Sequence, residues 1–171
     1  MRLLITVALV LFIDQLSKYL AISFIRTGQP IAVIDNFLYF TFALNPGAAF
    51  GLFPYQTTFF IVVTIIAAVL IVYFYRTIPA SHKWLRFGLA LLLGGALGNL
   101  TDRVRATYVV DFISFRFFPP VFNLADTAIV VGVGIILIAI WRTGGLESNM
   151  CEGSRESLPT VLNETSPNKH I

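Results

Sequence analysis

The hydrophobic positions of this chain are concentrated in four long segments, and polar or aromatic stretches separate them. The apolar segments cover residues 3–25, 56–75, 85–103 and 121–141. A helix of about 20 residues, rising about 1.5 Å per residue, crosses the hydrocarbon core of a bilayer. The pattern therefore predicts a bundle of four transmembrane helices that forms one membrane-embedded domain over residues 1–142.

The first apolar segment has a second interpretation, as a cleaved signal peptide. Arg2 and the apolar run 3–13 fit that interpretation. However, Asp14, Gln15 and Lys18 follow where a cleavage site of small residues is expected. A membrane-spanning helix is therefore the favoured prediction for this segment.

The segment 26–55 departs from the helical pattern and predicts a small sheet. Gly28 and Pro30 break the first helix, and an aromatic, β-prone run follows at 37–44. Asn45-Pro46-Gly47 is a turn signal. Because the segment has too few polar positions to be solvated on both faces, we expect an amphipathic sheet lying on the membrane surface.

The composition supports a membrane protein and excludes several other classes. Of the 171 residues, 57% are hydrophobic and 12% are charged, and the mean hydropathy is +0.81. A soluble domain has about twice that charged fraction. One cysteine, Cys151, excludes an internal disulfide, and with only two histidines no zinc cluster is expected. No nucleotide-binding or metalloprotease motif is present, so we expect no metal and no cofactor.

The charges also predict the orientation of the helices. Residues 1–142 carry ten Lys and Arg against five Asp, and no aromatic-interleaved basic patch suggests nucleic-acid binding. The turn 76–86 holds three of these cations, which predicts a cytoplasmic location for it and for both termini. The 26–55 and 104–120 connections then face outward. The polar tail, 143–171, is predicted to be cytoplasmic and disordered.

Several polar residues lie within or at the ends of the predicted spans. Asp14 and Lys18 are four residues apart, so they share a helix face and can form a buried ion pair that keeps the bundle in register. Direct chemistry by Asp14 is the second interpretation.

The end of the third span and the start of the fourth are also polar. Asn99, Asp102 and Arg103 share one helix face. They either complete the helix end, with Arg103 favourable near the C-terminus and paired with Asp102, or Asn99 and Arg103 donate hydrogen bonds to the carbonyl groups of a substrate. Asn123 and Asp126 have the spacing of a helix cap, which would hold Asp126 at the membrane boundary.

Two aspartates occupy the apolar stretch 108–127 and suggest catalysis. Asp111 lies in an extended hydrophobic run without a local capping partner, and Asp126 follows a Pro-Pro pair. A carboxylate in such surroundings is costly. Two neighbouring carboxylates cannot both ionise cheaply, so one holds a proton while the other acts as a base. Such a pair can activate water against a peptide carbonyl and protonate the departing nitrogen.

The chain resembles the lipoprotein signal peptidase, or signal peptidase II, family of aspartic membrane peptidases over about residues 10–130. The matching motifs, in order, are Asp14-Gln15 with Lys18, Asn45-Pro46-Gly47-Ala48-Ala49-Phe50-Gly51, Gly94-Gly95-Ala96-Leu97-Gly98-Asn99 with Asp102-Arg103, Val110-Asp111-Phe112, and Phe122-Asn123-Leu124-Ala125-Asp126. Five motifs in this order across four spans are specific, whereas any one alone would be weak.

The resemblance implies a fold, an activity and a set of site residues. The fold is an all-α membrane protein, with a four-transmembrane-helix bundle, a small extracytoplasmic β-cradle at about 30–50 and a short external segment between spans three and four. The activity is removal of signal peptides from prolipoproteins, with cleavage just before a diacylglyceryl-modified cysteine. Asp111 and Asp126 would be the catalytic dyad. The residues that bind substrate or support the site would be Asn45, Gly47, Asn99, Arg103, Asn123, Asp14, Lys18 and Asp102.

The same resemblance implies partners and a location. The partners are lipidated prolipoproteins, membrane lipids and globomycin-type inhibitors. The location is the bacterial cytoplasmic (inner) membrane, with the active site at the extracytoplasmic leaflet.

Two other functions are compatible with the residues alone. A proton-coupled small transporter also combines four spans with membrane carboxylates, although such carriers place the acid near the midplane. Here only Asp14 lies near mid-span, and Lys18 can neutralise it. A non-catalytic scaffold subunit would tolerate the loss of Asp111 and Asp126.

Overall fold

The computed structural model describes residues 2–25, 29–47 and 55–156. Its four helices are α1 (Arg2–Phe24), α2 (Thr57–Thr77), α3 (Lys83–Ala106) and α4 (Leu124–Glu156). Each contains a segment that is long and apolar enough to cross a membrane, so the four predicted spans are confirmed as helices. The fourth begins at Leu124 rather than 121, because the preceding residues belong to a strand.

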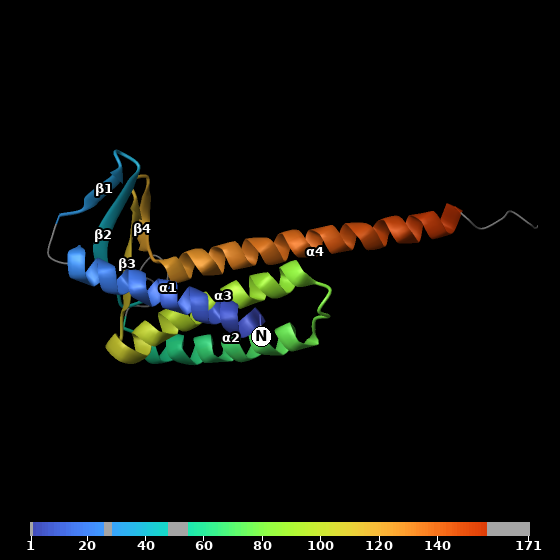
Figure 1. Ribbon diagram of the computed structural model, residues 1–171, viewed down its shortest axis with the longest axis horizontal. Coiled ribbons are helices and arrows are strands. Elements are labelled where there is room, and N and C mark those ends of the chain that lie inside the picture. The colour runs from blue at the N-terminus through green and yellow to red at the C-terminus, as the bar shows by residue number, and fades with distance from the viewer. Residues whose placement is uncertain (1, 26–28, 48–54, 157–171) are drawn as a thin grey trace, which may run out of the picture.

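A four-stranded antiparallel sheet stands at one end of the helices (Figure 1). Its strands, in spatial and chain order, are β1 (Ile31–Ile34), β2 (Leu38–Asn45), β3 (Val109–Phe115) and β4 (Phe118–Phe122). The strand predicted at 37–44 is present as β2. However, the sheet is larger than predicted, because the external segment between spans three and four is not a separate loop. It folds into the β3–β4 hairpin and pairs with β2.

Helix α3 occupies the centre of the bundle and packs against the other three helices. Its glycines permit this close packing. A Cβ on Gly98 would lie 2.6 Å from the Asp14 carboxylate on α1, and one on Gly95 would lie 2.4 Å from the Ala125 carbonyl oxygen on α4. Gly94 and Gly98, four residues apart, therefore lie on the face of α3 that contacts α1.

Two features attach the sheet to the helices. Thr107, with a φ of 68°, adopts the left-handed conformation that ends α3, and β3 begins two residues later. Phe112 on β3 then packs with Ala21 and Ile25 near the end of α1. The chain thus passes directly from α3 into β3, and from β4 it continues into α4. Residues at these helix ends therefore lie close to the strands.

Helix α4 continues beyond the predicted end of the fourth span at 141. Its backbone is helical to Glu156, where the sequence had suggested a disordered tail from residue 143. The difference has a simple reason: the first proline after the span is Pro159, and the Gly144-Gly145 pair alone does not stop the helix. Residues 157–171 of the tail, and Ala48-Ala49-Phe50-Gly51 of the second motif, lie outside the described residues.

Candidate active site

Asp126 lies in the first turn of α4, where it takes part in a reciprocal cap. The backbone N–H of Asp126 donates to Asn123 Oδ1 at 2.9 Å, and the backbone N–H of Asn123 donates to Asp126 Oδ2 at 3.2 Å. This is the capping arrangement expected from the spacing. The cap fixes the carboxylate at the positive end of the helix dipole, which favours its negative charge.

Asp111 comes from β3 and meets side chains from two other elements. Asn45 Nδ2 on β2 donates to Asp111 Oδ2 at 3.0 Å, and Asn123 Nδ2 donates to Asp111 Oδ1 at 2.6 Å. Asp111 is paired with Ala43 in the sheet, so Asn45, two residues along β2, projects from the same face. Asp111 is only 3% exposed.

Asn99 on α3 connects the two aspartates to a buried cation. Its Nδ2 donates to Asp126 Oδ1 at 2.8 Å, while its Oδ1 accepts from Lys18 Nζ at 3.0 Å and from Asn123 Nδ2 at 3.1 Å. Because an ammonium can only donate, Lys18 fixes which end of the Asn99 amide faces Asp126. Asn99 and Asn123 together form a bridge between the carboxylates of Asp126 and Asp111.

Lys18 is held by two carboxylates beneath this bridge. Its Nζ lies 2.9 Å from Asp14 Oδ2 and 2.8 Å from Asp102 Oδ2, so all three ammonium protons have acceptors. Asp14 also accepts the backbone N–H of Ala125 at 2.9 Å, which ties α1 to the first turn of α4. The predicted ion pair of Asp14 and Lys18 is present and is larger than predicted, since it includes Asp102.

Gln15 completes this buried cluster and has no predicted role in the sequence analysis. Its Nε2 donates to Asp102 Oδ1 at 2.9 Å and to Asp14 Oδ2 at 3.2 Å. The available signal is its position three residues before Lys18, which places both on one face of α1. Gln15 therefore supplies the extra donor that two carboxylates sharing one ammonium require.

Arg103 and Gly47 form a second connection, on the other side of the aspartates. Arg103 Nη2 donates to the Gly47 carbonyl oxygen at 2.9 Å, and its guanidinium lies 5.1 Å from the centre of the Phe60 ring. The Gly47 N–H donates to Asn45 Oδ1 at 3.0 Å. Arg103 therefore positions the end of β2 and, through Asn45, the carboxylate of Asp111.

The electrostatic environment raises the pKa of Asp111 toward neutral pH. Its pKa is raised to about 6, first by burial and second by the nearby charge of Asp126. The hydrogen bonds from Asn45 and Asn123 and the charge of Lys18 act in the opposite direction. The net result is a carboxyl group that binds a proton more tightly than a solvated aspartate does.

A cavity of about 330 Å³ opens beside Asp111. Its walls come from the end of β2 and from β4, and they consist of Ala43, Leu44, Asn45, Pro46, Asp111, Pro119, Pro120 and Val121. It offers an approach to the aspartate from the sheet side. Within the described part of the chain, no group of three or more His, Cys, Asp or Glu side chains is arranged to hold a metal ion.

The structure brings all ten predicted site residues into one connected network. The network joins three helices to two strands, and its members are Asp14, Lys18, Asn45, Gly47, Asn99, Asp102, Arg103, Asp111, Asn123 and Asp126. Every buried side-chain polar atom in the described residues has a hydrogen-bond partner. A network of this kind is rigid, because each amide orientation is fixed by its neighbours.

Residues 6–142 match a family model described as signal peptidase (SPase) II. The chain belongs to the signal peptidase II family. A lipoprotein signal peptidase of Caldanaerobacter subterraneus subsp. tengcongensis is 44% identical over 84% of this chain and 98% of that protein. Another, from Moorella thermoacetica, is 50% identical over 83% of this chain and 92% of that protein.

Solved structures agree with this assignment. One, described as a bacterial membrane enzyme, has a TM-score of 0.76 and 36% identity, and the match covers 82% of this chain and 88% of that one. A second, described in the same words, has a TM-score of 0.74. The resemblance found in the sequence motifs is confirmed. The protein is a multi-pass membrane peptidase of the signal peptidase II family, whose activity is the removal of signal peptides from lipoproteins.

Proposed function

We propose that the protein is an aspartic endopeptidase in which Asp111 and Asp126 form the catalytic dyad. The observation that carries the proposal is the bridge between them: Asn123 donates to both carboxylates, from its side chain to Asp111 and from its backbone to Asp126. Two carboxylates linked through Asn123, one on a strand beside a cavity and the other in the first turn of a helix, meet the needs of acid–base hydrolysis.

The surroundings of the two carboxylates favour different roles. Asp126 sits at the N-terminus of α4 and accepts from Asn99, whose orientation Lys18 fixes, and these contacts favour its negative charge against the effect of burial. Asp111 lies on a strand without a helix dipole, and its pKa is raised to about 6. On these local contacts we assign the role of base to Asp126 and the role of acid to Asp111.

The reaction then needs no metal and no covalent intermediate. Asp126 accepts a proton from water as the water oxygen bonds to the peptide carbonyl carbon. Asp111 gives its proton to the peptide nitrogen as the carbon–nitrogen bond breaks. Both carboxyl groups are protonated between these two steps, while the carbonyl oxygen carries the negative charge. The proton now on Asp126 restores the starting state when it passes to Asp111, so the pair begins and ends the cycle with one proton.

The proposed substrate is a prolipoprotein cut just before a cysteine that carries diacylglycerol. The carboxylates lie where the sheet meets the helix ends, which supports a position at the membrane surface rather than in its middle. A lipid-anchored cysteine stays at that surface. Arg103, which binds the Gly47 carbonyl oxygen, is placed to hold the substrate-facing end of β2. The proposed location is the extracytoplasmic face of the bacterial inner membrane, with both termini cytoplasmic.

A proton-coupled transporter remains the second candidate, and the packing of Asp14 argues against it. Asp14 is fully buried and ion-paired with Lys18, so this mid-span carboxylate has no direct access to water. A scaffold subunit would not require a network in which every buried polar group is satisfied around two carboxylates.

The test is cleavage of a diacylglyceryl-modified prolipoprotein by the purified protein in lipid. We expect a product that begins with the lipidated cysteine, identified by mass spectrometry, and loss of cleavage with globomycin. Cleavage at another bond would contradict the proposed substrate. Proton-driven solute uptake into proteoliposomes, without cleavage, would favour the transporter.

A further inference from the structure

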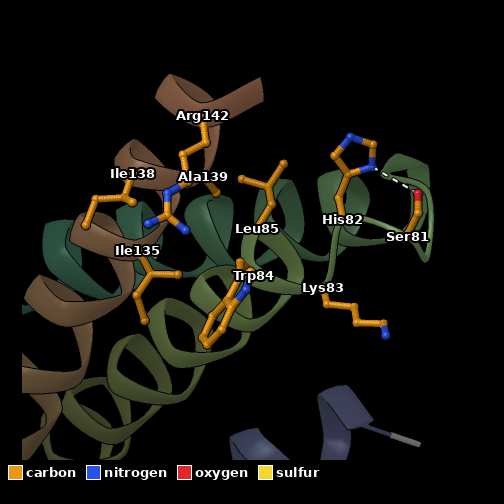
Figure 2. A pocket seen from close by; sticks show the side chains of 9 residues that line it. All are labelled: Ser81, His82, Lys83, Trp84, Leu85, Ile135, Ile138, Ala139 and Arg142. Carbon is orange, nitrogen blue, oxygen red and sulfur yellow. Dashed lines mark hydrogen bonds between the residues drawn. The ribbon is translucent and has the colours of Figure 1, made fainter. Parts of the chain in front are cut away.

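A second cavity lies at the opposite end of the bundle from the aspartates. Its volume is about 680 Å³. Figure 2 shows its walls, which come from the middle of α4 and from the α2–α3 connection with the first turn of α3. The lining residues are Ser81, His82, Lys83, Trp84, Leu85, Ile135, Ile138, Ala139 and Arg142.

The packing of α3 against α4 explains why a cavity forms there. The two helices touch closely at Gly88 and Gly132, where a Cβ on either residue would lie 2.8 Å from the carbonyl oxygen of the other. Beyond this contact, toward the start of α3, the larger side chains of Trp84 and Ile138 replace glycine. The helices therefore cannot stay in backbone contact, and a space opens between them.

The cavity spans the boundary between the apolar and polar zones of the protein. Lys83 is the first residue of α3, and Arg142 follows the apolar run of α4 that ends at Trp141, so we expect both cations near the edge of the bilayer. Ile135, Ile138 and Leu85 form an apolar wall on the membrane side of these cations. A molecule that fills this space must be apolar at one end and polar at the other.

The polar end carries positive charge. Arg142 extends into the space between α4 and the start of α3, and Lys83 lies at the rim with its side chain directed away from Arg142 (Figure 2). Helix α3 begins here without a side-chain cap, so the positive end of its dipole adds to the potential. The five aspartates of the chain lie in the active-site network or on the sheet. Among the described side chains, the surroundings therefore favour an anion.

Aromatic residues at the same level fit a lipid headgroup region. Both tryptophans of the chain, Trp84 and Trp141, lie at this end of the bundle and are 67% and 79% exposed. Tryptophan is enriched where membranes meet water. Lys and Arg near the ends of membrane helices reach toward lipid phosphates.

We propose that this cavity binds one anionic glycerophospholipid. Its phosphate lies beside Arg142 near the N-terminus of α3, where Lys83 adds positive charge, and one acyl chain packs on Ile135 and Ile138. The lipid joins the start of α3 to the middle of α4, and these two helices carry Asn99 and Asp126 to the active site. The site is separate from the aspartates and does not depend on the proposed catalytic mechanism.

The test measures binding of phosphatidylglycerol to the full-length protein in a neutral detergent by native mass spectrometry and thermal unfolding. We expect one tightly bound lipid and a higher midpoint of unfolding. The double variant Lys83→Gln, Arg142→Gln should bind about 30-fold more weakly, because each cation near an anionic lipid contributes about a fivefold effect. Arg76→Gln is the matched control, since Arg76 is an exposed cation at the end of α2 that does not line the cavity.

Three results would overturn the proposal. Equal weakening by Arg76→Gln and the double variant would indicate general surface attraction. Equal binding of phosphatidylcholine would show that the negative charge is not recognised. The same stabilisation by inorganic phosphate alone would assign the site to a free anion. Retained binding of phosphatidylglycerol by Arg76→Gln, with loss in the double variant, supports the lipid site.

Discussion

Replacing Asp111 with Asn should change the pH dependence of stability in a direction that the structure defines. The folded protein holds the proton of Asp111 more tightly than the unfolded chain does, because burial and Asp126 disfavour its charge. Its contribution to stability is therefore fully present below about pH 4 and is lost as the pH rises through about 6. The variant Asp111→Asn cannot ionise, so this loss disappears.

The pKa shift gives the size of the effect. The pKa of Asp111 rises from 3.8 to about 6, and at about 1.36 kcal/mol for each pKa unit this corresponds to about 3 kcal/mol. The exchange also has a cost that is independent of pH, since Asn45 and Asn123 both donate to Asp111 and an amide can accept only one of them in the same pose. The cost cancels when two pH values are compared.

The assay is the unfolding of the purified protein in detergent at pH 4 and pH 8. Between these values the wild type should lose about 3 kcal/mol relative to Asp111→Asn, or about 6–12 °C in unfolding midpoint for a chain of this size. Asp35→Asn is the control, because Asp35 is an exposed carboxylate in the turn before β2. Equal pH dependence in wild type and Asp111→Asn would refute the reasoning.

Three further predictions concern packing, charge and the pH profile. Gly95→Ala should destabilise the protein by about 1–3 kcal/mol, because the added Cβ would clash with the backbone of α4. Gly134→Ala is the control and should not destabilise it, since no atom lies within 4 Å of the added Cβ; thermal unfolding measures both variants. Lys18→Met should lower the free energy of unfolding by about 3–5 kcal/mol, since it leaves two buried carboxylates without their cation, and unchanged stability would contradict this. Asn45→Ala removes a hydrogen bond that lowers the pKa of Asp111, so the alkaline limb of kcat/KM should move to higher pH; a move to lower pH would disprove the link.

The helices of this protein could be predicted from its sequence, because a bilayer demands long apolar segments. The pairing of β3 and β4 with β2 could not. The run from Val109 to Phe122 is hydrophobic, and a loop resting on lipid would have the same composition as a β-hairpin. Only its long-range pairing with β2, more than 60 residues away, distinguishes the hairpin from such a loop. That pairing places Asp111 beside Asn45.

The candidate site was largely visible in the sequence, because its residues are polar in apolar surroundings. Spacing alone found the Asp14–Lys18 pair and the Asn123–Asp126 cap. Gln15 was not assigned a role, since a glutamine on a helix carries no charge to mark it and its partner Asp102 is 87 residues away. The role of Lys18 in orienting Asn99 likewise appears only when α1 and α3 are packed together.

The most direct measurement is the rate of prolipoprotein cleavage by Asp111→Asn and Asp126→Asn in the same lipid, with Asp35→Asn as the control. Both dyad variants should fold, as judged by unfolding midpoint, and each should lose about 10³-fold or more in kcat/KM, because each carboxylate transfers a proton in the reaction. Asp35→Asn should cleave at the wild-type rate. A folded Asp111→Asn or Asp126→Asn protein that retains near-normal cleavage would contradict the proposed dyad.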